Sequence, residues 1–464
     1  METATLGKGK LFGPASFYKK ALLIALPVML QMLIQNMVSL IDNFMVSGLG
    51  DVKMSGVNIS GQILFVFMVL LNTICTAGGI FMSQYYGAGD KRGMRQALSF
   101  KAVLAAAAMV LYLLVCMVFP RQILSLMVVG NSQADAILDE AVKYMFLMGF
   151  NGIPMAISTI CSSSLREIGR VRTPLYISVI ATLVNTFFNW VLIYGNLGFP
   201  EMGVRGAACA TLIARCVELI IVIWFLKYRE NVLNLNLRKL LHIDTSYVHD
   251  YMKVSLPVLI NQALWGVAQM VQTGILGHLG GDVTAANAIS VQVYQVLSVV
   301  CYGAASAAGI VVGRTIGEDN EKKLHPLVTT LQVLFISIGL CSGLAIFLLR
   351  GPILAAFGGT LTENAYRLSR QFMLVLAITT VGTSYQMACD NGIIRGGGDT
   401  AFSAKMNLVS MWCIIVPFSA MAAFWWKCPP VAVFFLLKWD QLYKAIPVGI
   451  RLHSWKWVKK VTRV

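Results

Sequence analysis

One carboxylic acid stands inside the first long apolar stretch of the chain. Residues 26–50 contain no Lys, Arg or Glu, yet Asp42 lies among them. At about 100° per residue in a helix, Gln31, Gln35 and Asp42 fall on one face and form a polar stripe. A charged group inside a membrane is costly unless it meets a partner or water, so such an acid marks a functional site. We interpret Asp42 as a group that binds and releases a proton or Na⁺.

Two later apolar stretches place polar groups at the same expected depth. Asn185 and Asn189 are four residues apart and share a face of one helix, and Thr211 lies in the next stretch. Carboxylate, amide and hydroxyl oxygens suit Na⁺, or a proton with water. The alternative is that the amides only form hydrogen bonds between helices. We predict that Asp42, Asn185, Asn189 and Thr211 form the ion-coupling site.

These residues must be held by membrane-spanning helices. The 464 residues are 57% hydrophobic and 12% charged, whereas a soluble domain carries about a quarter charged residues. The expected fold is therefore an all-α integral membrane protein. A span needs about 20 apolar residues, and twelve such windows occur, the last interrupted by Lys438 and Asp440. The windows lie near 20–46, 56–82, 98–119, 142–163, 173–196, 203–226, 252–278, 285–313, 326–349, 368–394, 403–425 and 429–449.

The basic residues between these windows predict an orientation. If the N-terminus is cytoplasmic, the cytoplasmic loops hold 27 Lys and Arg and the outer loops hold eight. The positive-inside rule then places both termini in the cytoplasm, and we expect the protein in the cell's inner or plasma membrane. Because the cations lie in short loops, the net charge of +16 does not indicate a nucleic-acid partner.

The chain repeats itself at a constant offset of 230 residues. Leu26, Pro27 and Val28 recur as Leu256, Pro257 and Val258, and Gln62 recurs as Gln292. Six spans per half is an even number, so the halves should be parallel lobes with the main cavity between them. We expect an N-lobe at 1–226, a cytoplasmic linker with a short amphipathic helix at 227–251, and a C-lobe at 252–464.

Other residues are assigned to the cavity or to hinges. Pro27 and Pro257 interrupt hydrogen bonding inside long spans and are predicted hinges. Asp390 is either an acid paired with Arg395 at a helix end or a second cation or substrate anchor, and Arg215 and Glu218 are expected to form an internal pair. The predicted substrate and cavity residues are Gln31, Gln35, Gln62, Gln262, Gln269, Gln292 and Asp390.

Several kinds of chemistry lack a signature. The ten Cys are single and mostly inside apolar runs, which is typical of small buried side chains. The five His form no ligand pair at helical spacing. The glycines at 396–398 follow no predicted strand, so we reject a nucleotide site. We expect no cofactor, no metal other than Na⁺ at Asp42, and no enzyme activity.

The chain resembles the multidrug and toxic compound extrusion (MATE) family over essentially its whole length. The similarity rests on LIDNFMVSGLG in the first span, GGIFMSQYYGAGDKR after the second with its repeat AAGIVVGRTIGEDNEKK, MGVRGAACAT, and IIRGGGDT after the tenth. The resemblance implies a cation-coupled antiporter that exports organic cations or amphipathic drugs by rocking its two lobes.

The resemblance also implies roles for residues. The acid of the first span in such transporters corresponds to Asp42, and a second acid often stands where this chain has Asn189. That replacement weakens the case for Na⁺ and favours a proton. We expect a monomer in the lipid bilayer. The alternative is a flippase for a lipid-linked oligosaccharide, which should line its cavity with several cations.

Overall fold

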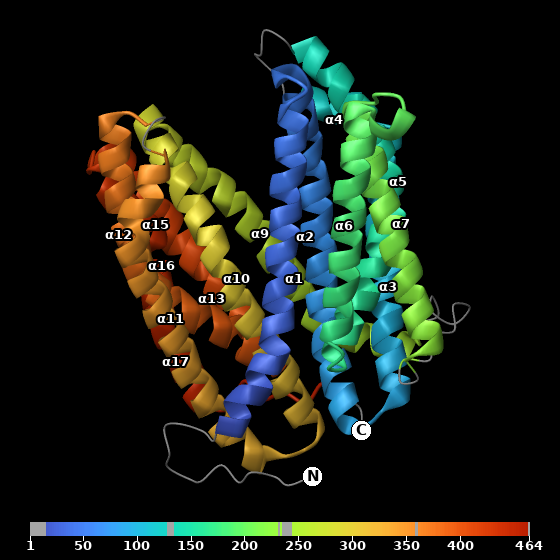
Figure 1. Cartoon of the computed structure of the whole chain (residues 1–464). Coiled ribbons are helices and arrows are strands. Elements are labelled where there is room, and N and C mark those ends of the chain that lie inside the picture. Colours follow the sequence, from blue (N-terminus) through green and yellow to red (C-terminus); the bar gives the residue numbers. More distant parts are fainter. Residues whose placement is uncertain (1–14, 128–133, 231–232, 234–243, 358–360, 463–464) are drawn as a thin grey trace. The chain divides into compact units, whose positions relative to one another are not determined.

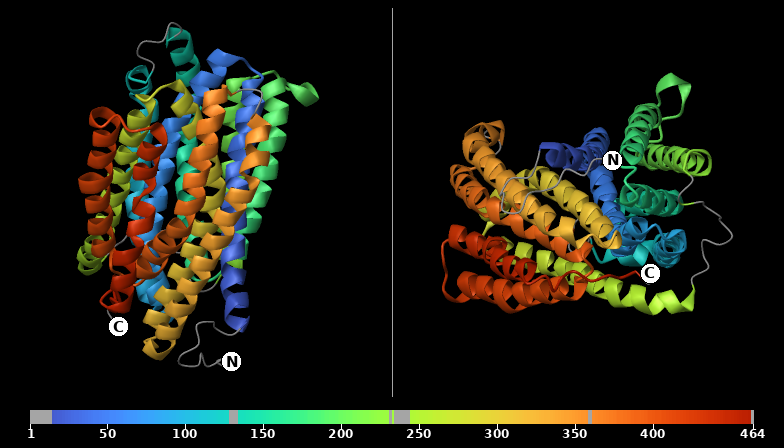
Figure 2. Two further views of the ribbon diagram at one scale, coloured as in Figure 1. Left: turned by 90° about the vertical axis from the view of Figure 1, so that its left-hand side faces the viewer. Right: turned by 90° about the horizontal axis from the view of Figure 1, so that it is seen from below.

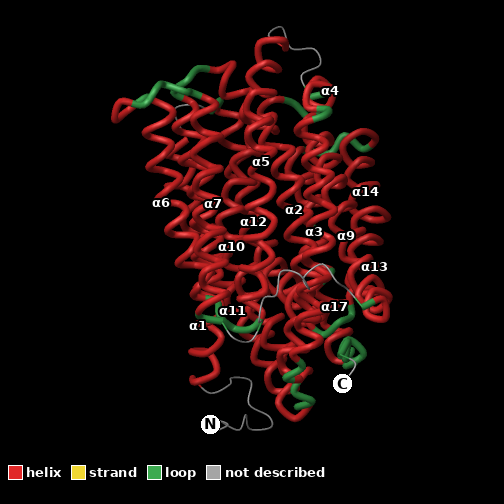
Figure 3. Tube along the Cα trace, turned by 90° about the vertical axis from the view of Figure 1, so that its right-hand side faces the viewer, coloured by secondary structure: helices red, strands yellow, loops and turns green. Residues whose placement is uncertain are grey.

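The computed structural model describes residues 15–127, 134–230, 233, 244–357 and 361–462. These residues form helices and no strand, as the tube in Figure 3 shows. Eleven helices among them are long and apolar enough to cross a membrane. The predicted all-α membrane fold is confirmed.

The twelfth predicted window is helical but broken. It consists of α15 (Pro430–Lys438), α16 (Asp440–Tyr443) and α17 (Ala445–His453), so none of its pieces is long enough to count as a span. The breaks fall among the charges that interrupt the sequence pattern. Asp440 and Lys444 are both buried and pair at 2.8 Å, one helical turn apart.

By packing, the chain divides into two units. The first, which we call the N-unit, is Leu30–Tyr251; the C-unit is Met252–Val464 together with Met1–Met29. Helix α1 (Ala15–Ser47) therefore belongs to both. Met29 packs so closely on Gly303 of the C-unit that a Cβ at Gly303 would lie 2.3 Å from Met29 Cγ. The lobe limits predicted at 226 and 252 stay a prediction, and the centre of the linker lies outside the described residues.

The N-unit is a bundle in which α5 packs mainly against α2, α3 and α7 and has smaller contacts with α4 and α6, while α6 pairs with α7 (Figures 1 and 2). The α6–α7 contact is close because Gly206 faces the Leu192 carbonyl, where a Cβ would be only 2.4 Å from the oxygen. Besides α1, its helices are α2 (Asp51–Ala88), α3 (Lys91–Met117), α4 (Pro120–Ser125), α5 (Ala134–Glu167), α6 (Arg172–Tyr194), η1 (Asn196–Gly198) and α7 (Val204–Tyr228).

The C-unit is built around α12, which contacts α10, α11 and the three short helices of the broken span. Three π-helical segments interrupt its tenth and eleventh spans, and such segments are frequent at functional sites. The remaining helices are α9 (Thr245–Gly277), α10 (Gly281–Gly317), α11 (Glu321–Phe357), α12 (Glu363–Ala388), η2 (Cys389–Ile394), α13 (Thr400–Leu408), η3 (Val409–Ile415), α14 (Val416–Ala420) and η4 (Met421–Trp425).

The segment after α17 closes one end of the C-unit. Trp457 is fully buried against Gly397, where an added Cβ would lie 2.3 Å from the indole ring. Arg451 and Lys459 each approach a carboxylate oxygen of Asp399 to 2.6 Å. The glycines at 396–398 are thus closely packed backbone.

The other glycine pair, Gly78 and Gly79 of α2, makes room for a buried ion pair. Lys101 of α3 and Glu167 of α5 form this pair, and Ser163 donates a hydrogen bond to Glu167 at 2.7 Å. A Cβ at either glycine would lie 2.5 Å from one of the paired side chains. The pair therefore joins α2, α3 and α5 at one place.

Replacing only one member of this pair should destabilise the protein. We expect Lys101→Met to lower the free energy of unfolding by about 3–5 kcal/mol, because it leaves the Glu167 carboxylate buried without its partner. The measurement is thermal unfolding of the purified protein in detergent.

The double variant Lys101→Met/Glu167→Leu provides the control. Replacing both charges by apolar groups should restore most of the lost stability. If the double variant unfolds as early as the single one, the ion pair is not the cause.

Candidate functional site

The four residues of the predicted ion-coupling site form one hydrogen-bonded chain in the N-unit. Asn189 Nδ2 donates to Asp42 Oδ1 at 2.5 Å and to Asn185 Oδ1 at 3.2 Å. Asn185 Nδ2 in turn donates to Thr211 Oγ1 at 3.4 Å. The structure thus brings together Asp42 of α1, both asparagines of α6 and Thr211 of α7.

Helix geometry explains this arrangement. Asn185 and Asn189 lie one turn apart on the buried face of α6, with exposed fractions of 4% and 1%. The close α6–α7 packing at Gly206 brings Thr211 within reach, and the Thr211 hydroxyl also donates to the Ala207 carbonyl at 3.0 Å. Asp42 is half-buried and is the first residue in this series of hydrogen bonds.

One buried oxygen among these four hydrogen-bonded side chains accepts no hydrogen bond from a described residue. Asn189 Oδ1 is buried and has no hydrogen-bond partner among the described residues. A buried acceptor without a donor is costly, so this atom is available to a proton on a neighbouring group, to water or to a cation. Asp42 is the one carboxylate among these four hydrogen-bonded residues. The described residues contain no cluster of three His, Cys, Asp or Glu that could hold a metal ion.

The predicted internal pair on α7 is confirmed. Arg215 Nη1 and Glu218 Oε2 lie 2.6 Å apart, one turn from each other. Arg215 is also near enough to act electrostatically on Asp42, as is the buried Tyr144 of α5. Sequence reasoning missed Tyr144 and also Asn151, which lies two turns along on α5 and has no partner for its buried amide among the described residues. An asparagine within an apolar window was the available signal.

Gln31 and Gln35, the other residues of the predicted polar stripe on α1, do not belong to this hydrogen-bonded group. Gln31 is buried, donates to Ser178 Oγ at 3.0 Å and accepts from Arg166 Nη1 at 3.1 Å. Gln35 and Gln62 are exposed. Gln31 therefore belongs to a separate contact among α1, α5 and α6.

The C-unit contains a polar cavity of about 130 Å³. Three of the predicted cavity residues, Gln262, Gln269 and Asp390, line it, whereas Gln292 is exposed and does not. Asp390 Oδ2 accepts from Ser403 at 2.8 Å and from Asn407 at 3.1 Å. The predicted pairing with Arg395 is also present, at 3.5 Å.

A second group of charges faces the same cavity from the broken span. Lys444 Nζ donates to Asp440 Oδ2 at 2.8 Å and to Asn407 Oδ1 at 3.0 Å, which links this group to Asp390. Lys438 also lines the cavity and lies 5.5 Å from the Tyr294 ring centre. In the sequence these charges read only as an interruption of a span.

The repeat register would have found two further cavity residues. At the offset of 230, Gln31 corresponds to Asn261 and Asp42 corresponds to Gln272. Both Asn261 and Gln272 are buried and line the cavity. The C-unit therefore carries amides where the N-unit carries an amide and an acid.

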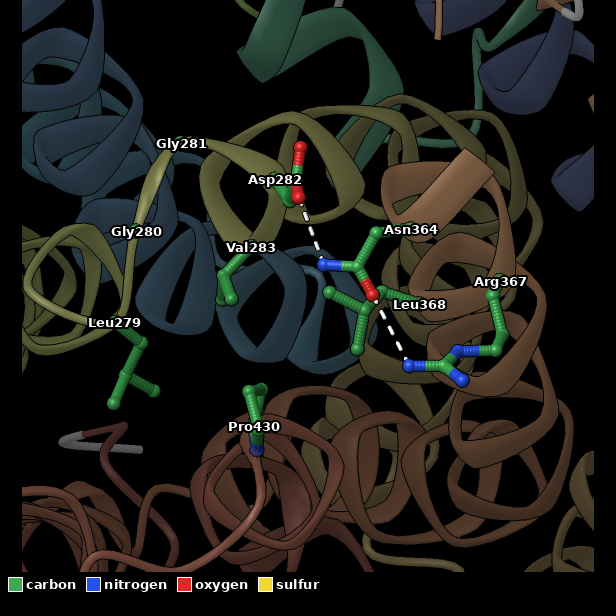
Figure 4. Close-up of a pocket in the computed structure, with 9 residues that line it drawn as sticks. All are labelled: Leu279, Gly280, Gly281, Asp282, Val283, Asn364, Arg367, Leu368 and Pro430. Carbon is green, nitrogen blue, oxygen red and sulfur yellow. Dashed lines mark hydrogen bonds between the residues drawn. The ribbon is translucent and has the colours of Figure 1, made fainter. Parts of the chain in front are cut away.

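A larger hollow, of about 470 Å³, lies between the α9–α10 turn, the start of α12 and Pro430 (Figure 4). Several of its polar groups contact one another. Asn364 Nδ2 donates to Asp282 Oδ2 at 2.7 Å, and Arg367 donates to Asn364 Oδ1 at 3.1 Å.

The two predicted hinge prolines lie inside their helices. Pro27 is buried in α1, and Pro257 is half-buried in α9. Their role as hinges stays a prediction.

Comparison with known proteins agrees with this architecture. A family model described as MatE matches residues 27–191 and again 257–421, so the two matches begin 230 residues apart, as the repeat predicts. The probable multidrug resistance protein NorM of Thermotoga maritima is 24% identical over 447 residues, which cover 95% of this chain and 93% of that protein. The protein of the same name from Agrobacterium fabrum is 25% identical over 89% and 88%.

Solved structures agree as well. A crystal structure of MATE in the bent conformation has a TM-score of 0.84 at 19% identity and covers 94% of this chain and 96% of its own. That likeness establishes the fold. Because the MatE model accounts for most of both halves of the chain, the protein is a multi-pass membrane transporter, and not an enzyme, that belongs to the MatE family.

Proposed function

We propose that this transporter is a secondary antiporter that exports organic cations or amphipathic drugs in exchange for H⁺ or Na⁺. The observation that carries the proposal is the buried chain from Asp42 through Asn189 and Asn185 to Thr211. Support for the substrate class comes from relatives named as probable multidrug resistance proteins.

These hydrogen bonds suggest how a proton that binds Asp42 would act. Ionised Asp42 accepts a hydrogen bond from Asn189 Nδ2. A protonated carboxyl must instead donate one, and Asn189 Oδ1 is a buried acceptor without a partner among the described residues. Reversal of the Asn189 amide would present that oxygen to Asp42. Proton binding would then break the Asn189–Asn185 contact and change how α1 is held against α6.

Na⁺ is the less favoured ion on this geometry. A hard cation prefers several oxygen ligands, and here one carboxylate stands beside neutral groups. The family resemblance places a second acid at the position of Asn189, which this chain lacks. We therefore expect proton coupling first.

Alternating access would follow from the two repeated halves, with helices bending at Pro27 and Pro257. The excess of Lys and Arg in alternate loops supports a bacterial inner or plasma membrane location with both termini cytoplasmic. We expect the working unit to be a monomer.

A lipid-linked oligosaccharide flippase is the second candidate, and one observation favours it. Three basic residues, Arg395, Lys438 and Lys444, line the cavity of the C-unit. A flippase would use cations of this kind to hold a diphosphate.

Removing the carboxyl group should abolish transport. We expect Asp42→Asn to lose export of a fluorescent cationic dye from cells with an imposed pH gradient, because the side chain can no longer exchange a proton. The measurement is dye efflux at equal expression of the two proteins. Asp139→Asn, which changes an exposed acid of α5, is the matched control and should export normally. Equal export by wild type and Asp42→Asn would make Asp42 structural, and no export by wild type would favour the flippase.

A second acid at position 189 should change which ion drives export. We expect Asn189→Asp to make dye export depend on an imposed Na⁺ gradient, because two carboxylates bind a cation more strongly than one. The measurement compares efflux driven by Na⁺ and by pH gradients. An Asn189→Asp variant that is active but unresponsive to Na⁺ would argue against this site as the place of ion binding.

A further inference from the structure

The polar cavity of the C-unit has a composition that the exchange of cations does not require. Its lining comes from α9, α10, α12, the π-helical segments η2 and η3, α13 and the broken span. All of these residues lie in one packing unit. Two π-helical segments around one cavity are typical of a functional site.

The charges of the cavity do not balance. Five charged side chains line it: Asp390, Asp440, Arg395, Lys438 and Lys444. Arg395 pairs with Asp390, and Lys444 pairs with Asp440. Lys438 forms no ion pair with any carboxylate that the structure describes. The cavity therefore carries one uncompensated positive charge.

Lys438 is held by aromatic rings instead. Its ammonium lies 5.5 Å from the centre of Tyr294 and 6.0 Å from that of Phe434, within the range of a cation–π contact. Trp265, Trp412 and Tyr302 add further aromatic surface to the lining. The charge thus lies beside flat apolar surface that an aromatic ligand can contact.

Donors in the cavity also lack acceptors. Trp412 Nε1 is buried and has no hydrogen-bond partner among the described residues. The amides of Gln262 and Gln269 have no partner in that part of the chain either. An indole N–H only donates, so Trp412 and Lys438 both need an acceptor, and a carboxylate is the strongest one available.

We propose that this cavity binds an aromatic carboxylate that carries a single negative charge, with Lys438 as its ion partner and Trp412 as a second donor. A diphosphate carries more charge than one free lysine can balance, which makes it the weaker fit. Asp390 Oδ1, the other unpaired buried atom, can accept from a donor group on the ligand. The inference rests on the proposed function only in treating this ligand as a transported substrate.

The experiment is equilibrium binding to the full-length protein in lipid nanodiscs, followed by quenching of tryptophan fluorescence. The probes are naphthoate, neutral naphthamide and cationic naphthylmethylammonium, which share one ring system. We expect naphthoate to bind best. Lys438→Met should weaken naphthoate binding about tenfold to a hundredfold, which matches the loss of a charge-assisted hydrogen bond.

Three variants keep the test sharp. Lys438→Arg should retain most of the affinity because it keeps the charge. Trp412→Phe should keep the ring and weaken binding less than Lys438→Met does. Lys427→Met removes an exposed lysine that does not line the cavity, and it should bind naphthoate as wild type does. Naphthamide binding to every variant reports whether the cavity is intact.

Two results would overturn the proposal: naphthoate binding no tighter than naphthamide, or Lys438→Met binding naphthoate as well as wild type. The outcome is separable from the antiporter proposal. Asp42→Asn should bind naphthoate normally even where it exports no dye, because Asp42 belongs to the other packing unit.

Discussion

The need to pair every polar group inside an apolar helix bundle governs this structure. Four ion pairs lie in or beside the spans: Lys101 with Glu167, Arg215 with Glu218, Lys444 with Asp440 and Arg395 with Asp390. Such pairs are weak sources of net stability, but losing one member is costly. The buried atoms left without partners in the described part of the chain are therefore informative, and they include Asn189 Oδ1 beside Asp42 in the N-unit and Asp390 Oδ1 and Trp412 Nε1 in the cavity of the C-unit.

The two halves share a backbone plan and differ in what they place on it. The repeat sets the amide Gln272 where the N-unit has the acid Asp42, and the broken span of the C-unit adds Lys438. One half thus holds a lone acid among neutral groups, and the other holds a surplus base among amides and aromatic rings. Duplication followed by such exchanges gives a transporter two polar sites of opposite charge.

Helical spacing was enough to predict that Asp42, Asn185, Asn189 and Thr211 meet in the N-unit. The separation of Asn185 and Asn189 put them on one face, and counting spans put Asp42 and Thr211 at the same depth. Spacing could not decide which residues of a stripe are buried: Gln35, Gln62 and Gln292 are exposed, and their role in a cavity stays a prediction. The cavity of the C-unit was harder to foresee, because its charges on α15, on α16 and just before α17 meet residues of α12, η2 and α13 that only tertiary packing brings near. Tyr144 had no signal in the sequence at all.

The sharing of α1 between the two units bears on how the protein is made. Residues 15–29 pack with the C-unit, yet they leave the ribosome more than two hundred residues before the helices of that unit. While the N-unit is being inserted, the start of α1 is in the membrane without the C-unit helices that it finally packs against. Met29 can pack against Gly303 only after α10 has been inserted. A chain cut in the linker would separate the C-unit from a piece of its own packing.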